Sequence, residues 1–129
     1  MARIDRFEDI EGWKLARRVC NRVYDVSSNG VFSKDFALVN QIRRASVSIM
    51  SNIAEGFERD GNKEFLQFLS VAKGSCGEVR SQLYIASDRG YVDETTFNEM
   101  SGILTETSKT LSGLMKYLRQ SDEKGRKIK

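Results

Sequence analysis

The sequence predicts an all-α protein folded as an up-down-up-down antiparallel four-helix bundle. It has no proline in 129 residues, so the residue that most often breaks helices is missing. Apolar residues recur with the period of an α-helix in four segments. Serine, asparagine, aspartate and glycine gather between these segments, as is typical of turns. A chain of this length can bury a single core, so we expect one domain over residues 1–120 and a disordered basic tail over residues 121–129.

The charge composition is mildly basic, with 21 Lys and Arg against 18 Asp and Glu and a net charge of +3. Such a balance permits nucleic-acid binding without requiring it. The sequence has no histidine, which removes a common general base and metal ligand. We therefore expect no enzyme activity, no catalytic residue, no cofactor and no metal site.

No apolar run approaches the roughly 20 residues that a membrane span needs, and the first eight residues have no apolar signal core. A cytoplasmic protein without a membrane partner is expected. Cys20 and Cys76 fall at core positions of predicted helices, where a reduced cysteine acts as a small apolar residue. We expect no disulfide bond.

The first helix is predicted from about Asp9 to Ser27, with Phe7 as an anchor just before it. Gly30 or Asn29 can take the left-handed conformation that ends a helix. On a helical wheel, apolar residues gather on one side. The opposite side is basic and holds Lys14, Arg17, Arg18 and Arg22.

The second helix is predicted from Ser33, as its N-terminal cap, to about Glu58. Its apolar residues cover an arc of about 200°, twice the roughly 100° stripe that a helix needs to face one core. We therefore expect this helix to have more than one apolar partner. The arc contains Phe36, Leu38, Val39, Ile42, Ala45, Val47, Ile49, Met50, Ile53, Ala54 and Phe57.

Arg43 falls inside this apolar arc, where an unpaired charge would be costly. It needs a carboxylate or a polar pocket. Glu55 and Glu78 are candidate partners, and the pair would then be a structural charge at a helix junction or a subunit interface. Glu55 and Glu58 do not suggest an enzyme, because both lie on the polar side and no Glu-x-x-His motif accompanies them.

The third helix is predicted with Asn62 as its cap and a core stripe from Phe65 to Asp88. Gly74 and Gly77 lower its helix propensity, so we expect close packing there against small residues of the second helix. A bulky residue at Ala54 or Gly74 would then disrupt packing or assembly. Gly90 is predicted to end this helix, and Asp93 to cap a fourth that runs to about Gln120.

Several motifs resemble a known family over about residues 7–118. The chain is similar to the four-helix-bundle proteins encoded in intervening sequences of bacterial 23S ribosomal RNA genes, which are sometimes labelled a ribosomal protein. These motifs are Gln41–Ala45, Ser51–Gly56, Glu64–Leu69 and Ala72–Ser75, together with Trp13, Ala16, Gln82, Leu83, Gly90 and Tyr91.

The resemblance implies a self-associating protein. Members of the family are similar to accessory proteins of diversity-generating retroelements, which assemble as homopentameric barrels with a basic surface that engages nucleic acid and a reverse transcriptase. The resemblance therefore implies a homo-oligomer, specifically a pentamer. It also implies binding to ribosomal or other structured RNA, or to a protein partner. It implies no catalytic residue.

Two interpretations of function remain open. In the first, a basic surface binds phosphate, because guanidinium groups match phosphate in geometry and charge; a plain solvated helix face has the same composition. In the second, the wide apolar arc of the second helix serves self-assembly or a partner helix, as in a scaffold. What separates them is whether Arg17, Arg18 and Arg22 share one exposed surface or are neutralised by acids. The candidate phosphate-binding residues are Lys14, Arg17, Arg18, Arg22 and Arg44.

Overall fold

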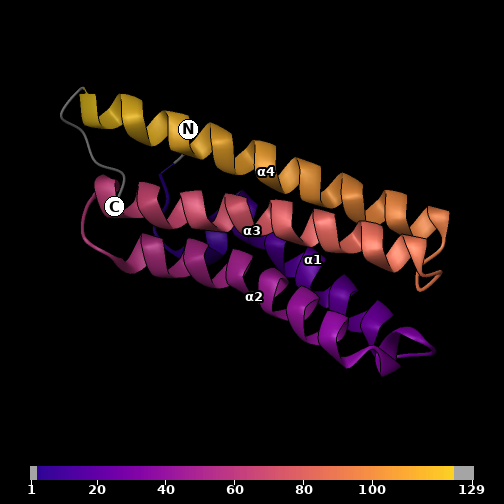
Figure 1. Cartoon of the computed structure of the whole chain (residues 1–129). Coiled ribbons are helices and arrows are strands. Elements are labelled where there is room, and N and C mark those ends of the chain that lie inside the picture. The colour runs from indigo at the N-terminus through magenta and orange to yellow at the C-terminus, as the bar shows by residue number, and fades with distance from the viewer. Residues whose placement is uncertain (1–2, 124–129) are drawn as a thin grey trace.

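The computed structural model describes residues 3–123, which form four α-helices and two short 3-10 turns with no strand among them. Figure 1 shows the helices running lengthwise along one bundle. The elements in chain order are η1 Phe7–Asp9, α1 Glu11–Ser27, η2 Phe32–Lys34, α2 Phe36–Glu58, α3 Asn62–Asp88 and α4 Glu94–Glu123.

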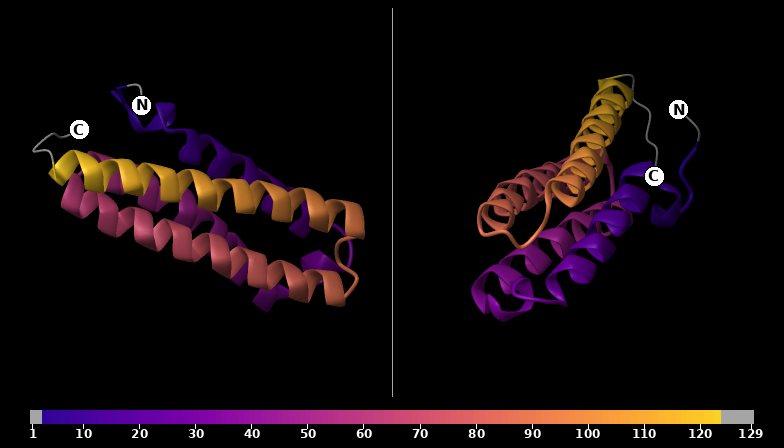
Figure 2. Two further views of the ribbon diagram at one scale, coloured as in Figure 1. Left: turned by 90° about the horizontal axis from the view of Figure 1, so that it is seen from above. Right: turned by 90° about the vertical axis from the view of Figure 1, so that its right-hand side faces the viewer.

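Consecutive helices pack side by side, and α4 closes the bundle against α1. In cross-section the order is therefore α1, α2, α3, α4, so the α1–α2 side lies opposite the α3–α4 side. Figure 2 shows this arrangement from above and from one end. The predicted all-α four-helix bundle is confirmed.

The core lies along the bundle axis and is built from the predicted apolar stripes. Each helix contributes fully buried side chains, among them Val19, Ile49, Leu69 and Leu104. Phe7 packs edge-on against Trp13, with ring centroids 5.2 Å apart, which anchors the lead-in to α1 as expected. Cys20 and Cys76 are both free thiols.

Two predicted helix caps are wrong. Ser33 lies in η2, and α2 is capped instead by Asp35, whose Oδ1 accepts a hydrogen bond from the Leu38 N–H at 3.2 Å. Asn62 is the first residue of α3 and caps nothing; Gly61 precedes it with φ of 84°. Asn62 is only 2% exposed, and its side-chain amide forms no hydrogen bond with the described residues.

The turn between α3 and α4 follows the sequence prediction. Gly90 adopts a positive φ of 73° just after α3 ends. Asp93 caps α4, and its Oδ1 accepts a hydrogen bond from the Thr96 N–H at 2.8 Å. This bond favours the carboxylate and lowers the pKa of Asp93.

Because α2 packs against both α1 and α3, its wide apolar arc has two partners, as predicted. The arc is wider than the buried area, however. Phe36 is 74% exposed and Val47 is 39% exposed. These two residues lie at the edge of α2 that neither neighbour covers.

The close approach between α2 and α3 lies at Gly56 rather than at the α3 glycines. A Cβ at Gly56 would lie 2.6 Å from the Phe68 Cβ, closer than real contacts allow. A Cβ at Gly74 or Gly77 would meet nothing within 4 Å. The expectation that Gly74 is needed for packing against α2 is therefore wrong within the chain, since Gly74 and Gly77 lie on the exposed side of α3.

Helix α4 extends to Glu123, three residues beyond the predicted end. Ser121 is only 4% exposed and still belongs to the packed bundle. The remaining part of the predicted basic tail, residues 124–129, lies outside the described residues.

Candidate nucleic-acid interface

An open hollow on the surface between α1 and α2 brings two arginines together. Its volume is about 440 Å³. Neither of the two arginines forms an ion pair with a described carboxylate. We call this site the α1–α2 hollow; it is lined by Tyr24, Asn40, Arg43, Arg44, Val47 and Ser48.

The guanidinium of Arg43 is held in place at this hollow by α1 and the residue that follows it. Its Nε donates to Ser27 Oγ at 2.9 Å and its Nη2 donates to Ser28 Oγ at 3.1 Å. The group also lies over the Tyr24 ring, 4.5 Å from the centroid, where a cation is favoured. Arg43 thus occupies a polar pocket, one of the two environments its position requires.

Arg43 does not pair with Glu55 or Glu78 in the described structure, so that expectation is wrong within the chain. Glu55 accepts a hydrogen bond from Arg59 at 2.8 Å, one helical turn further along. This pair is half exposed and also raises the pKa of Arg59. The charge of Arg43 is therefore stabilised by hydroxyl groups and a ring, and its positive charge is not neutralised.

We expect Arg43→Met to lower the free energy of unfolding by about 1 kcal/mol less than Arg43→Ala, because a methionine side chain is long enough to contact the Tyr24 ring and alanine is not. Urea unfolding of both variants measures the difference. Equal losses of stability would show that the contact contributes nothing. If both variants unfold like the parent but lose RNA binding, the charge itself serves binding.

The basic side of α1 separates into two groups. Lys14, Arg17 and Arg18 are exposed and form no ion pair with a described side chain; Arg17 lies 5.8 Å from the centroid of the Trp13 ring. Arg22 instead bonds Glu99 of α4 at 2.9 Å and lies 3.7 Å from Asp25. Arg22 therefore connects α1 to α4, and the other three remain available to a ligand.

Of the three exposed cations of α1, only Arg17 lies on the side of α1 that faces the hollow. Arg17 precedes Tyr24 by two helical turns, so it lies on the edge of α1 that borders α2. Arg44 is exposed on α2 and lines the hollow. Lys14 and Arg18 lie further round α1, with Glu11 and Asp25 on the same exposed side.

Sequence reasoning missed the neutral members of the hollow. Asn40 stands one turn before Arg44 on the same side of α2, a spacing that the sequence does show. Tyr24 and Ser48 had no such signal, since Tyr24 reaches the site only through the packing of α1 on α2. Ser48 is held from α3, because its Oγ lies 3.0 Å from Ser75 Oγ.

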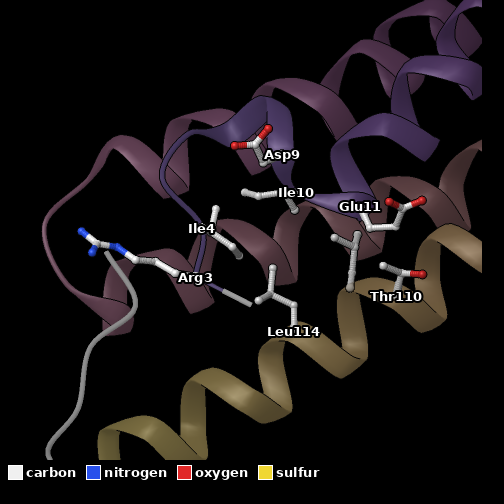
Figure 3. A pocket seen from close by; sticks show the side chains of 9 residues that line it. Arg3, Ile4, Asp9, Ile10, Glu11, Thr110 and Leu114 are labelled. Atoms are coloured by element: carbon white, nitrogen blue, oxygen red, sulfur yellow. The ribbon is translucent and has the colours of Figure 1, made fainter. Parts of the chain in front are cut away.

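A second, more enclosed pocket of about 330 Å³ lies between the N-terminal segment and α4. In Figure 3, Ile4, Ile10 and Leu114 point into the same space, while Arg3 extends away from it. Asp9 and Glu11 also line this pocket. Its floor suits an aliphatic group, and none of the predicted site residues lies there.

Other kinds of site have little support in the described part of the chain. No group of three or more Cys, Asp or Glu residues there is arranged to hold a metal ion. Burial raises the pKa of the Cys76 thiol to about 11, so it stays protonated at neutral pH and is a poor nucleophile. Among the described residues, no helix combines the length and the apolar character needed to cross a membrane.

Comparison with known proteins gives a family and a fold. A family model described as "23S rRNA-intervening sequence protein" matches residues 8–113. A crystal structure from Bacteroides thetaiotaomicron, of a protein with unknown function from the S23 ribosomal protein family, superimposes with a TM-score of 0.75 at 21% identity. The match covers 81% of this chain and 95% of that one. No curated protein matches the sequence.

Proposed function

The chain belongs to the 23S rRNA-intervening sequence protein family, and on this basis we propose that it is a non-enzymatic protein that binds structured RNA. The α1–α2 hollow contacts the phosphate backbone, and the exposed cations of α1 extend the contact. The single observation that carries the proposal is the hollow itself, in which two guanidinium groups meet with no carboxylate among the described residues that line it.

The chemistry of the hollow suits phosphate oxygen atoms. A guanidinium group offers a planar set of donors with a permanent charge, and Arg43 is already positioned by Ser27 and Ser28. The Asn40 amide and the Ser48 hydroxyl line the same hollow. Such groups supply most protein contacts to nucleic-acid backbones.

The kind of nucleic acid follows from the aromatic residues. Single strands are usually bound by stacking bases on exposed rings. On the α1 side of the proposed surface the aromatic rings are Trp13 and Tyr24, and each has an arginine of the same protein beside it. A folded RNA read by its backbone and shape is therefore the better match.

We expect the variant Arg17→Gln, Arg18→Gln, Arg44→Gln to weaken RNA binding and to reduce its salt dependence. The slope of log K against log salt should fall by about three, because each substitution removes one phosphate partner. Anisotropy of a labelled structured RNA, measured with nuclease-treated protein at low and at physiological salt, tests this. The control replaces Arg3, Arg6 and Arg59, which carry the same charge but already lie beside carboxylates. Equal slopes in the two variants would contradict the proposed surface.

A self-assembling scaffold is the second candidate, supported by the apolar residues that the bundle leaves uncovered. Phe36 is 74% exposed, Val47 39% and Tyr24 42%. Phe36 and Val47 lie on one side of α2, three turns apart, and a second copy of the chain would cover them in a homo-oligomer, with five subunits as the family resemblance implies. If the parent protein binds no RNA even at low salt, this scaffold becomes the better account.

A further inference from the structure

The face formed by α3 and α4 carries a row of cations that is separate from the α1–α2 hollow. On α3, Lys73 and Arg80 are seven residues apart, and on α4 Lys109 and Lys116 have the same spacing. Seven residues are about two helical turns, so each pair lies on one face of its helix. All four side chains are exposed. We call these four residues the α3–α4 track.

The side of α3 that carries Lys73 and Arg80 also carries Tyr84 and therefore faces α4, while Lys109 and Lys116 lie on the exposed outer side of α4. Tyr84, one turn after Arg80, packs against Phe97 of α4 with ring centroids 5.0 Å apart. Because the helices are antiparallel, counting back from Tyr84 and forward from Phe97 brings Lys73 level with Lys109. Arg80 and Lys116 then lie toward opposite ends, so the track is about 20 Å long at 1.5 Å per residue.

The charges of the track are free of described acidic partners. None of its four cations comes within 4.0 Å of a described carboxylate. Glu106 stands three residues before Lys109 without pairing with it, and Glu78 projects from another side of α3, two residues from Arg80. The same two helices carry hydroxyl residues that are exposed or half-buried, namely Ser70, Ser81, Ser101, Thr105 and Ser112.

Two glycines beside the cations have no packing role inside the chain. A Cβ at Gly77 or at Gly102 would meet nothing within 4 Å. Glycine weakens a helix relative to alanine, so internal packing does not explain its presence at either position. Because no side chain projects from these two positions, the backbone of a bound molecule can come close to the helices.

This pattern points to duplex RNA rather than to a protein. Protein interfaces depend on buried aromatic and apolar anchors. Of the three large apolar side chains that α3 exposes, Val71, Tyr84 and Ile85, only Tyr84 lies on the same side of the helix as Lys73 and Arg80, at one end of the track. Cations and hydroxyl groups instead match the phosphates and 2′-hydroxyl groups of an A-form duplex. We propose that the α3–α4 track is a second RNA-binding surface that contacts the backbone of an RNA duplex.

The position of the track gives this proposal a consequence of its own. The α3–α4 side lies opposite the α1–α2 side in the bundle. A straight duplex on one side cannot reach the other, so one chain can hold two duplex segments at once. The inference shares the class of ligand with the proposed function but does not depend on the α1–α2 hollow.

The test uses a labelled RNA duplex of about 16 base pairs, the length that a duplex-binding domain spans. The full chain, a track variant and a charge-matched control are compared by anisotropy at several salt concentrations and by sedimentation to count duplexes per chain. Circular dichroism checks that each variant is folded. The track variant is K73Q, R80Q, K109Q, K116Q, and the control is R3Q, R6Q, K34Q, R89Q.

We expect the parent and the control to bind two duplexes per chain, and the track variant to bind one with a salt slope lower by about four. A folded track variant that binds as many duplexes as the control, with the same salt slope, would overturn the inference. The Arg17, Arg18 and Arg44 variant separates the two proposals. If only this variant loses RNA binding, the α1–α2 hollow binds RNA and the inference about the track is wrong. If only the track variant loses RNA binding, the track binds RNA and the proposal for the hollow is wrong.

Discussion

Replacing Phe32 by alanine is expected to lower the free energy of unfolding by about 3–5 kcal/mol, the usual cost of truncating a buried phenylalanine. Phe32 is 1% exposed and lies in η2, between α1 and α2. It stacks on Tyr91 from the α3–α4 turn, with ring centroids 5.0 Å apart. Tyr91 in turn donates a hydrogen bond to Asp35 at 2.9 Å, which raises the pKa of Tyr91. Phe32 therefore holds the two turns at this end of the bundle together.

The chain offers a matched control four residues away. Phe36 is 74% exposed, so Phe36→Ala should change the free energy of unfolding by no more than about 0.5 kcal/mol. Urea unfolding followed by circular dichroism compares the two variants with the parent. A loss as large for Phe36 as for Phe32 would mean that Phe36 is covered, as it would be in an oligomer. A small loss for Phe32 would contradict its role at the bundle end.

Replacing Gly56 by alanine is expected to lower the free energy of unfolding by about 1–3 kcal/mol, although alanine favours the helix more than glycine does. The new Cβ would lie 2.6 Å from the Cβ of Phe68 and 3.1 Å from Cδ1 of Phe65. The Phe68 atom is next to the backbone and cannot turn away, so α2 and α3 would have to separate.

Gly74→Ala is the control for this substitution. Nothing lies within 4 Å of a Cβ there, so the variant should be more stable than the parent by about 1 kcal/mol, the difference in helix propensity. Thermal unfolding of both variants shows whether each alanine raises or lowers the stability of the protein. Stabilisation by the alanine at Gly56 would show that the helices can move apart without cost. Destabilisation at Gly74 would show that another chain packs on that face.

Much of the fold could be predicted from local patterns. The stripes on α3 and α4 identified buried residues such as Leu83 and Leu111, because a helix with one apolar side must turn that side inward. Asp93 and Gly90 marked the ends of helices through backbone requirements that are local. The predictions for Ser33 and Asn62 are wrong because several polar residues compete for one cap. The Ser33 hydroxyl donates to the Gly30 carbonyl instead, and Asn62 is buried as the first residue of its helix.

The candidate site was less predictable. The basic side of α1 was visible on a helical wheel, but the wheel could not show that Arg22 pairs with Glu99 of α4. The wheel also suggested Glu55 as a partner for Arg43, whereas the groups that accept hydrogen bonds from Arg43 are Ser27 and Ser28, at the end of α1. Wheels describe one helix at a time, and ion pairs between helices depend on how the helices are turned toward each other.

Helical period and turn residues are properties of short segments, so the order of the amino acids was enough to specify a bundle of four helices. Which glycine marks the close approach of two helices depends instead on tertiary packing, which selects Gly56 and leaves Gly74 uncovered. The same packing sets Lys73 level with Lys109 of α4, because residues far apart in the chain meet only when helix order and register are fixed by the whole core.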